Sequence, residues 1–401
     1  MARPEIYRYL DQFTEHLGNA SERVFNGKII YPRQLEVHLP SDRKVACNFD
    51  CHYCQGRQVA HLLSNWEEDG LRVIEQLQGA IPYYIFGGVY TEPLMNEYLP
   101  EYIKLAKKYK NNFGMHTNGS LFEELEYKKG LCSIIINRAT DSRDYVSVSL
   151  DAGTAESHKK VKNVKEDWFT RIIEGIQILV KLRGSRDYPS IRVCYLMTKL
   201  NSSEGEIRTI VNIMKDLKVD SLRFSVPYDH YGKSFDRVRK YRNSWEIPFG
   251  EKCEQTVRPY LSHSFSERPY IFWHPPGFQD VEKMNFRQCV YSYYQITFGA
   301  DGWVYKCSST AAPDFTHSRL GRVPNNLEDF NKMVLANHDP KFEACTCFNA
   351  GARCNRVALE INQAWNNGEL FKDQTQNLPS SVKEDQEARS EDLFVQIAPT
   401  E

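Results

Sequence analysis

Short apolar runs alternate with longer amphipathic stretches along the chain from residue 35 onward. The short runs are rich in β-branched and aromatic residues, which favours strands, and they cover 35–39, 83–86, 113–117, 146–151, 191–197 and 221–226. The longer stretches place apolar residues three and four positions apart among charges, which favours helices, and they cover 66–79, 97–109, 121–129, 165–183 and 203–217. The pattern therefore predicts six strands joined by crossover helices.

This alternation of strands and helices predicts a parallel sheet covered by its helices. Six strands are two fewer than a closed eight-stranded barrel has, so the predicted fold class is α/β, a partial (βα)6 TIM-type barrel, with an open sheet as the alternative. In both arrangements functional residues gather at the carboxyl ends of the strands. The residues that follow each strand are therefore the first candidates for a site.

The chain has 401 residues, more than one hydrophobic core usually organises, and its composition changes along its length. An N-terminal extension over 1–34 precedes the predicted barrel over 35–230, and an aromatic and basic linker region follows over 231–285. A small C-terminal α+β domain is expected over 286–365, because this segment holds several cysteines and a hairpin pattern around Ala300-Asp301-Gly302. The acidic tail over 366–401 has few aromatics, which is typical of disorder.

Charge and cysteine content narrow the class of protein. Lysine and arginine number 51 against 52 aspartate and glutamate, so no net field attracts nucleic acid or a membrane, and a small or locally bound substrate is expected. The chain has no signal-peptide pattern, and no apolar run approaches the about 18 residues of a membrane span. We expect a cytoplasmic protein whose 11 cysteines include metal ligands rather than disulfides.

The first cysteine cluster follows the first predicted strand. Cys47, Cys51 and Cys54 have C-x3-C-x2-C spacing, which lets three sulfurs meet on one loop. Thiolates select zinc or iron–sulfur clusters, and three of them leave one coordination position open. A zinc site completed by His52 or His61 is the structural alternative.

This motif, with Tyr53 before its last cysteine, resembles the signature of the radical S-adenosylmethionine (SAM) superfamily. The resemblance implies a 4Fe-4S cluster on Cys47, Cys51 and Cys54 whose open iron binds the amino and carboxylate groups of SAM. It also implies reductive cleavage of SAM to a 5′-deoxyadenosyl radical that abstracts hydrogen, with flavodoxin or ferredoxin as electron donor. The protein's own task is then to position the substrate and exclude side reactions.

Two further strand ends are similar to motifs of this family. Gly87 and Gly88 resemble the glycine-rich motif that receives the SAM amino group, although three residues separate them from its acid, Glu92. A glycine pair lets the backbone approach a ligand closely. Glu92 is alternatively a turn acid before proline. The third strand ends in Thr117-Asn118-Gly119, which is similar to the family's ending and makes Asn118 a predicted cofactor contact.

The later strand ends extend the resemblance over about residues 35–230. Ser149 and Asp151 alternate onto one face of the fourth strand and, with Lys162, resemble the stretch that contacts the ribose and methionine carboxylate of SAM. Many relatives have arginine in place of Lys162, and a lysine in solvent is the alternative. Val226, after the sixth strand, matches the position whose backbone meets adenine.

A second set of cysteines occupies the predicted C-terminal domain. Cys289 and Cys307 flank the hairpin, and Cys345, Cys347 and Cys354 follow a helical stretch. The set resembles the auxiliary-cluster domains called SPASM and Twitch, and five cysteines fit one auxiliary 4Fe-4S cluster better than two. The implied ligands are Cys289, Cys307, Cys347 and Cys354, with Cys345 able to replace Cys347. A structural zinc ribbon is the alternative.

Three cysteines, Cys132, Cys194 and Cys253, remain outside both sets. Free cysteines usually behave as small buried hydrophobic residues. A thiol that faces the adenosyl site can instead give a hydrogen atom to a substrate radical, and Cys253 is the predicted catalytic donor.

These residues and the resemblance predict a radical SAM oxidoreductase or epimerase of natural product biosynthesis. Its predicted substrate is a polar small molecule (a sugar, cyclitol or aminoglycoside-like metabolite), contacted by Tyr228, Asp229 and His230. One alternative is a radical SAM maturase of a ribosomally made peptide, although about 46 residues before Cys47 are too few for a leader-binding domain. A remote alternative is a zinc protein that binds RNA through the basic region 233–242.

Overall fold

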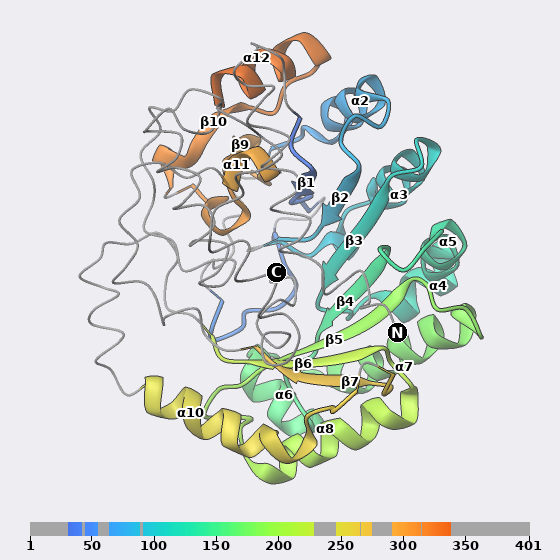
Figure 1. Cartoon of the computed structure of the whole chain (residues 1–401), viewed down its shortest axis with the longest axis vertical. Coiled ribbons are helices and arrows are strands. Elements are labelled where there is room, and N and C mark those ends of the chain that lie inside the picture. Colours follow the sequence, from blue (N-terminus) through green and yellow to red (C-terminus); the bar gives the residue numbers. More distant parts are fainter. Residues whose placement is uncertain are drawn as a thin grey trace, which may run out of the picture.

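The computed structural model describes residues 31–41, 45–54, 64–88, 91–227, 246–264, 266–274, 291–313 and 315–337. Their strands form one ten-stranded sheet in the order β10-β9-β8-β1-β2-β3-β4-β5-β6-β7. The sheet curves into an arc, and helices α2, α3, α5, α7 and α8 lie along its convex side (Figure 1). The partial TIM-type barrel of mostly parallel strands that was predicted from the sequence is confirmed.

Six parallel strands make up the centre of the sheet, and all six were predicted. They are β1 (Gln34–Val37), β2 (Tyr83–Phe86), β3 (Asn112–Thr117), β4 (Tyr145–Ser149), β5 (Ser190–Leu196) and β6 (Ser221–Ser225). Each pairs in parallel with the next. Because parallel neighbours end at the same edge, this pairing brings the motifs at the ends of β1 to β6 together.

The parallel sheet is longer than predicted at both sides. Strand β7 (Tyr270–Trp273) pairs with β6, and β8 (Gln295–Phe298) pairs with β1, both in parallel. Strand β7 lies in the segment 231–285 that was expected to be a linker. Within the described residues β7 and β8 do not pair, so the barrel is open between them. The boundaries proposed for the domains stay predictions.

The helices follow their strands along the chain. They are α2 (Glu67–Leu77), α3 (Leu99–Lys108), α4 (Phe122–Lys129), α5 (Leu131–Arg138), α6 (Ala155–Lys162), α7 (Trp168–Arg183), α8 (Glu204–Leu217) and α10 (Glu246–Val257). Short 3-10 turns lie at Pro93–Met95 (η3), Arg258–Tyr260 (η4), Ser308–Thr310 (η6) and Thr316–Ser318 (η7). All five predicted helices are confirmed, whereas α5 and α6 were not predicted.

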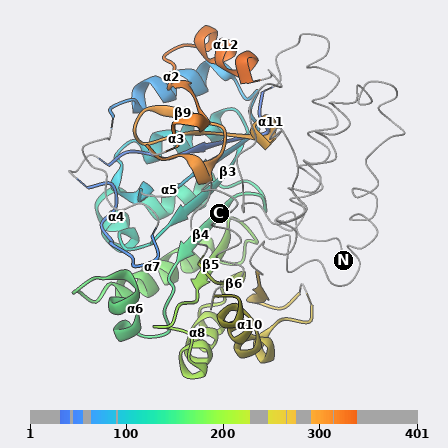
Figure 2. The same ribbon diagram turned by 90° about the vertical axis from the view of Figure 1, so that its left-hand side faces the viewer.

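The C-terminal part of the described chain extends the sheet with antiparallel strands. The predicted hairpin is confirmed by β8 and β9 (Trp303–Tyr305), which turn at Gly302, and β10 (Arg319–Arg322) pairs with β9. Two further helices are α11 (Tyr291–Tyr294) and α12 (Leu327–Asn337). Helices α12 and α2 lie at one end of the molecule, and α8 and α10 lie at the other (Figure 2). None of the helices described is long and apolar enough to cross a membrane.

The two faces of the parallel sheet differ in chemistry. The helix-covered face is apolar, with Leu35, Val37, Val146 and Val148 fully buried in the main core. Because side chains alternate along a strand, the intervening residues point to the concave face. That inner face carries polar side chains, among them Gln34, Glu36, His38, His116, Tyr145, Ser147, Ser149, Arg192, Cys194, Arg223 and Ser225. The concave face is thus suited to a polar ligand.

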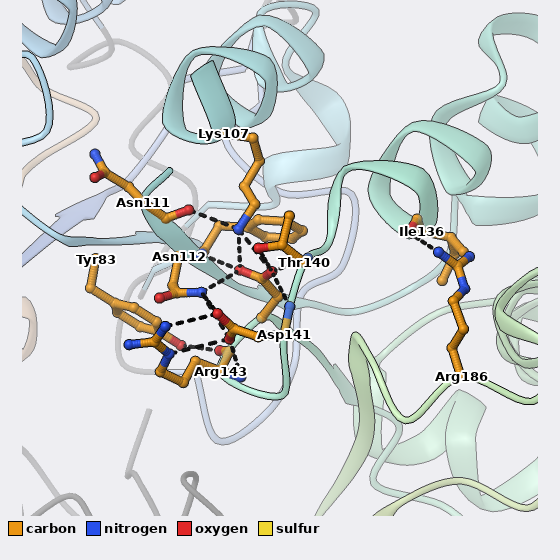
Figure 3. A network of polar contacts seen from close by, with 11 residues as sticks. Tyr83, Lys107, Asn111, Asn112, Ile136, Thr140, Asp141, Arg143 and Arg186 are labelled. Carbon is orange, nitrogen blue, oxygen red and sulfur yellow. Dashed lines mark hydrogen bonds and ion pairs between the residues drawn. The ribbon is translucent and has the colours of Figure 1, made fainter. Parts of the chain in front are cut away.

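A buried polar network lies at the opposite end of the strands from the motifs (Figure 3). Lys107 of α3 lies 2.8 Å from Asp144, which precedes β4, and both side chains are almost fully buried. Asp144 also accepts hydrogen bonds from the backbone of Phe113 (2.9 Å) and Thr140 (2.7 Å). In barrels of this kind the amino ends of the strands serve stability and the carboxyl ends serve function. This network therefore fixes the starts of β3 and β4.

Candidate functional site

The loop that carries the first cysteine cluster leaves β1 and crosses the carboxyl edge of the sheet. Backbone hydrogen bonds join it to the loop before η3, through Glu92 and Ala46 (3.0 Å), and to the end of α6, through His52 and Val161 (3.3 Å). Phe49 packs edge-on against His158 of α6, with ring centroids 5.7 Å apart. The fold therefore holds the loop at the position where the strand ends converge.

The donor set around the cysteines fits an iron–sulfur cluster. The sulfur of Cys47 accepts hydrogen bonds from the backbone of Phe49 (3.5 Å) and from Nδ2 of Asn118 (3.7 Å), and such bonds stabilise a bound thiolate. Burial, helped by the charge of Glu92, raises the pKa of the Cys47 thiol to about 12. A free thiolate is therefore unfavourable here, and a metal held by Cys47 would take the place of the thiol proton.

The described part of the chain shows no group of side chains arranged to bind a single metal ion. No three His, Cys, Asp or Glu side chains there converge as the ligands of one metal ion must. In a 4Fe-4S cubane each thiolate binds a different iron, so the sulfurs of Cys47, Cys51 and Cys54 need not meet at one point. For the zinc alternative, His52 is exposed and His61 lies outside the described residues. The three cysteine sulfurs are therefore compatible with a cluster.

Glu92 is buried beside the third strand end. Its carboxylate accepts hydrogen bonds from the backbone of Leu94 (3.0 Å) and Asn118 (2.7 Å) and from the hydroxyl of Thr117. Burial raises the pKa of Glu92 to about 7, although these hydrogen bonds oppose the shift. Both oxygens thus bind the chain itself and cap η3, which agrees with the turn-acid alternative. A contact of Glu92 with SAM stays a prediction.

Asn118 connects the end of β3 to the cysteine loop. Its Nδ2 donates to Oδ1 of Asn48 at 2.8 Å, and its Oδ1 accepts from the backbone of Ser120 at 2.9 Å. By contacting Asn48 and the sulfur of Cys47, the side chain of Asn118 joins the end of β3 to the loop that carries the first cysteine cluster. The structure therefore brings Asn118 to the site.

The glycine pair after β2 is required by close packing. A Cβ atom on Gly88 would lie 2.3 Å from the ring of His38, and the φ of Gly88 is +140°. A Cβ atom on Gly87 would lie 2.8 Å from the Cβ of His116. Any side chain at Gly88 is therefore strained and would push apart the ends of β1 and β2.

Tyr53, Asp151 and Lys162 form a triad in which the ion pair of Lys162 and Asp151 is buried. Nζ of Lys162 lies 2.5 Å from Oδ2 of Asp151 and 2.6 Å from the hydroxyl of Tyr53, which itself donates to Asp151 at 2.5 Å. Burial lowers the pKa of Lys162, but the charges of Asp151 and Cys51 outweigh it and raise the pKa overall. Lys162 is 1% exposed, so the alternative of a lysine in solvent is wrong. The triad joins the cysteine loop, the end of β4 and α6.

The other predicted positions divide between the two faces. Ser149 ends β4 on the inner face, and Val226 directly follows β6. Cys253 lies in α10, 1% exposed within the apolar core, and burial raises the pKa of its thiol to about 12. Because α10 packs beside α8 on the helix side, the structure does not bring Cys253 to the inner face. Cys194 faces inward instead, 3.2 Å from the hydroxyl of Ser147.

Of the predicted auxiliary-cluster ligands, the structure describes Cys307. Cys307 lies two residues after the end of β9, at the start of η6, and is 7% exposed. The other predicted auxiliary ligands and substrate contacts lie outside the described residues: Cys289, Cys345, Cys347, Cys354, Tyr228, Asp229 and His230. The ligand set of the auxiliary cluster therefore stays a prediction.

Several polar residues of the inner face were missed in the sequence. Nε2 of His116 is 2.8 Å from the hydroxyl of Tyr145, and the guanidinium of Arg192 stacks 3.7 Å from the Tyr145 ring centroid. Burial, reinforced by Arg223 and Arg192, lowers the pKa of His116 to about 3, so its ring is neutral. The signal that could have found them is the polar residue at every second position of the strands.

The fold and the cysteine loop together indicate an iron–sulfur enzyme whose candidate site lies at the carboxyl ends of the strands of a partial barrel. Residues 44–214 match the model of the Radical SAM superfamily, so this part of the chain is a radical SAM domain. This domain match agrees with the resemblance of the cysteine loop and with a 4Fe-4S cluster and SAM as its cofactors. A comparison with curated proteins finds no match.

Solved structures support the fold. One is Streptococcus suis SuiB bound to precursor peptide SuiA, at 15% identity and a TM-score of 0.53, with 82% of this chain and 69% of that chain covered. Another is native anSMEcpe with bound AdoMet, at 16% identity and a TM-score of 0.52, with 88% and 99% covered. At such identities the likeness concerns the fold, which here includes the C-terminal segment as well as the barrel.

Proposed function

We propose that this protein modifies a peptide by abstracting hydrogen from one of its residues. The observation that carries the radical chemistry is the Cys47 loop, which Asn118 and Lys162 tie to the carboxyl ends of β3 and β4. Peptide as the substrate class is supported by the similarity in fold to SuiB, whose structure is bound to precursor peptide SuiA. This replaces the small-molecule substrate as the leading hypothesis.

The residues that would hold the cofactors follow from their positions. Cys47, Cys51 and Cys54 would bind the catalytic cluster, and Gly87, Gly88, Asn118, Ser149, Asp151 and Val226 lie at the strand ends where SAM would bind. When bound, the cluster and SAM supply the 5′-deoxyadenosyl radical. We further propose flavodoxin or ferredoxin as electron donor and one auxiliary 4Fe-4S cluster that includes Cys307.

The chain's own residues keep the reaction in a defined place. The triad of Tyr53, Asp151 and Lys162 anchors the cysteine loop, because a buried ion pair with a third hydrogen-bonding partner resists displacement. The two N–H donors to the sulfur of Cys47 stabilise its thiolate form. Burial of these groups excludes water from the place where a reactive radical must survive.

A polar small molecule is the second candidate, because the inner face is polar. Arg192 and Arg223 are 6% and 9% exposed on neighbouring strands, and Tyr145 and Ser147 lie on the same face. Such a surface also suits a sugar, cyclitol or aminoglycoside-like compound undergoing oxidation or epimerisation.

The test compares two panels of compounds with the reconstituted enzyme under anaerobic conditions. One panel holds short capped peptides that differ in the central residue, and the other holds polyols, sugars and amino sugars. We expect a peptide to accelerate 5′-deoxyadenosine formation and to change in mass. Acceleration by a sugar or polyol alone would overturn the peptide proposal while keeping the radical mechanism. Cys132→Ala, which removes a buried cysteine of α5 outside the C-x3-C-x2-C motif, should respond to the two panels as the wild type does.

A further inference from the structure

Glu36 and His38 form a buried pair on the inner face of β1 and just after it. Nε2 of His38 lies 2.7 Å from Oε1 of Glu36, and the two side chains are 1% and 3% exposed. Buried charged and polar groups of this kind must be matched by partners, so the state of each atom can be worked out.

The partners of Glu36 decide where the imidazole proton lies. Oε2 of Glu36 accepts a hydrogen bond from Nε2 of Gln295 (2.8 Å), whose own Oε1 accepts from Nε2 of Gln34 (2.5 Å). With one oxygen accepting from Gln295 and the other facing Nε2 of His38, both carboxylate oxygens of Glu36 serve as acceptors. His38 must then carry its proton on Nε2 and a lone pair on Nδ1.

The lone pair on Nδ1 of His38 lies at the carboxyl edge of the sheet and has no hydrogen-bond donor among the described residues. The Nδ1 atom is itself buried. The ring lies directly against Gly88, and the backbone N–H of His38 is held by the carbonyl of Phe298 at 2.8 Å. A buried acceptor without a partner is unfavourable, so a donor from a bound molecule would stabilise it.

Polar and basic side chains of the neighbouring strands surround the pair. His116 faces His38 from β3 with Tyr145 bonded to it, and Arg192 and Arg223 lie on the same face of β5 and β6. Glu36 is the acidic side chain on the same inner face as these two arginines. These cations would stabilise negative charge on a ligand bound nearby.

We propose that Glu36 and His38 form an acceptor dyad for an O–H or N–H group of a molecule bound inside the barrel. Where that molecule is the substrate, its proton passes to Nδ1, the substrate keeps the electron pair, and Glu36 balances the imidazolium. This step rests on the proposed function, because it needs a substrate on the inner face. The tautomer does not.

The test is ring-nitrogen NMR of intact holoprotein labelled with 15N-histidine, with its clusters oxidised. We expect a histidine protonated at Nε2 with a lone pair on Nδ1, whose signal is missing in His38→Gln and kept in His263→Gln, an exposed histidine. Glu36→Gln should weaken this tautomer preference. If His38→Gln does not fold, His38→Asn provides the assignment. An Nδ1 that carries a proton in the wild type overturns the dyad.

Added compounds then identify the donor. A His38 Nδ1 signal that moves with SAM alone assigns the donor to an N–H or O–H group of SAM. A signal that moves only with a panel compound that accelerates SAM cleavage assigns it to the substrate. In that case His38→Gln should lower product formation about 100-fold or more, and His263→Gln should leave it unchanged. A signal that moves with neither SAM nor a panel compound contradicts the acceptor role. This outcome does not depend on whether the peptide proposal holds.

Discussion

Lys162 shows how a single buried charge organises this site. It sits almost without exposure between Asp151 and Tyr53, and it lies on a short helix that sequence periodicity did not predict. The resemblance indicated that Lys162 lies near the cofactor. It did not indicate that Lys162 forms an ion pair with a neighbouring carboxylate. This pairing depends on tertiary contacts. Lys162 contacts Asp151, 11 residues away in the sequence, and Tyr53, 109 residues away.

Removing this lysine should destabilise the protein strongly. Lys162→Met leaves Asp151 buried without its counter-charge, which typically costs about 3–5 kcal/mol of unfolding free energy. Lys160→Met is the matched control on the same helix, because its ion pair with Glu156 is exposed and should contribute under about 1 kcal/mol. Urea unfolding of both variants measures the difference. Equal losses in the two would contradict the triad.

Glu92 should make stability depend on pH. Its folded pKa of about 7 exceeds the ordinary value of 4.5, so the folded protein binds the proton more tightly than the unfolded chain. The stabilisation is therefore complete below pH 4.5 and is lost as pH rises through about 7, by on the order of 3 kcal/mol. Unfolding of the wild type and Glu92→Gln between pH 5.5 and 8 measures it. A difference that does not change with pH in this window would refute the shift.

At the scale of elements, the predictable part is the central sheet. Strands β1 to β6 were found because each is an apolar run between amphipathic stretches, and their ends moved by two residues at most. Strand β7 was missed because Tyr270–Trp273 is a short aromatic run without a clear helical pattern before it. Helix α6 was missed because its eight residues are mostly polar and two buried ones, His158 and Lys162, look like surface positions.

The end of β2 should tolerate no side chain. Gly88→Ala places a Cβ atom 2.3 Å from the His38 ring at a φ that alanine disfavours, so we expect lower stability, by about 1–3 kcal/mol, and weaker SAM binding. Gly205→Ala in α8 meets nothing within 4 Å and should be neutral or stabilising by up to about 1 kcal/mol. Thermal unfolding and equilibrium SAM binding measure both. Normal SAM binding by Gly88→Ala would count against this role.

At the scale of the whole molecule, the sheet joins the two halves of the chain. Strand β8 comes from the segment predicted as the auxiliary domain, yet it pairs with β1, and Gln295 contacts Glu36 across 259 residues of sequence. Motif spacing can reveal Cys47, Cys51 and Cys54 because they are close in the chain. It cannot reveal an acceptor dyad whose orientation depends on a distant strand, and this is why His38 was missed.

The same arrangement explains why the substrate class must come from experiment. Parallel strands deliver Asn118, Ser149, Asp151 and Val226 to one edge whatever the substrate is. The polar residues of the inner face are compatible with a peptide side chain or with a small polar molecule. Fold-level likeness can order these hypotheses but does not choose between them.

The central claim is that Cys47, Cys51 and Cys54 hold the cluster that cleaves SAM. The most direct measurement is anaerobic iron and sulfide content together with reductive 5′-deoxyadenosine formation, for the wild type and for Cys47→Ala/Cys51→Ala/Cys54→Ala, with Cys132→Ala as control. We predict that the triple variant loses about four irons with their sulfides and forms no 5′-deoxyadenosine, whereas the control matches the wild type. Zinc without iron in the wild type, or 5′-deoxyadenosine from the triple variant, would contradict the account.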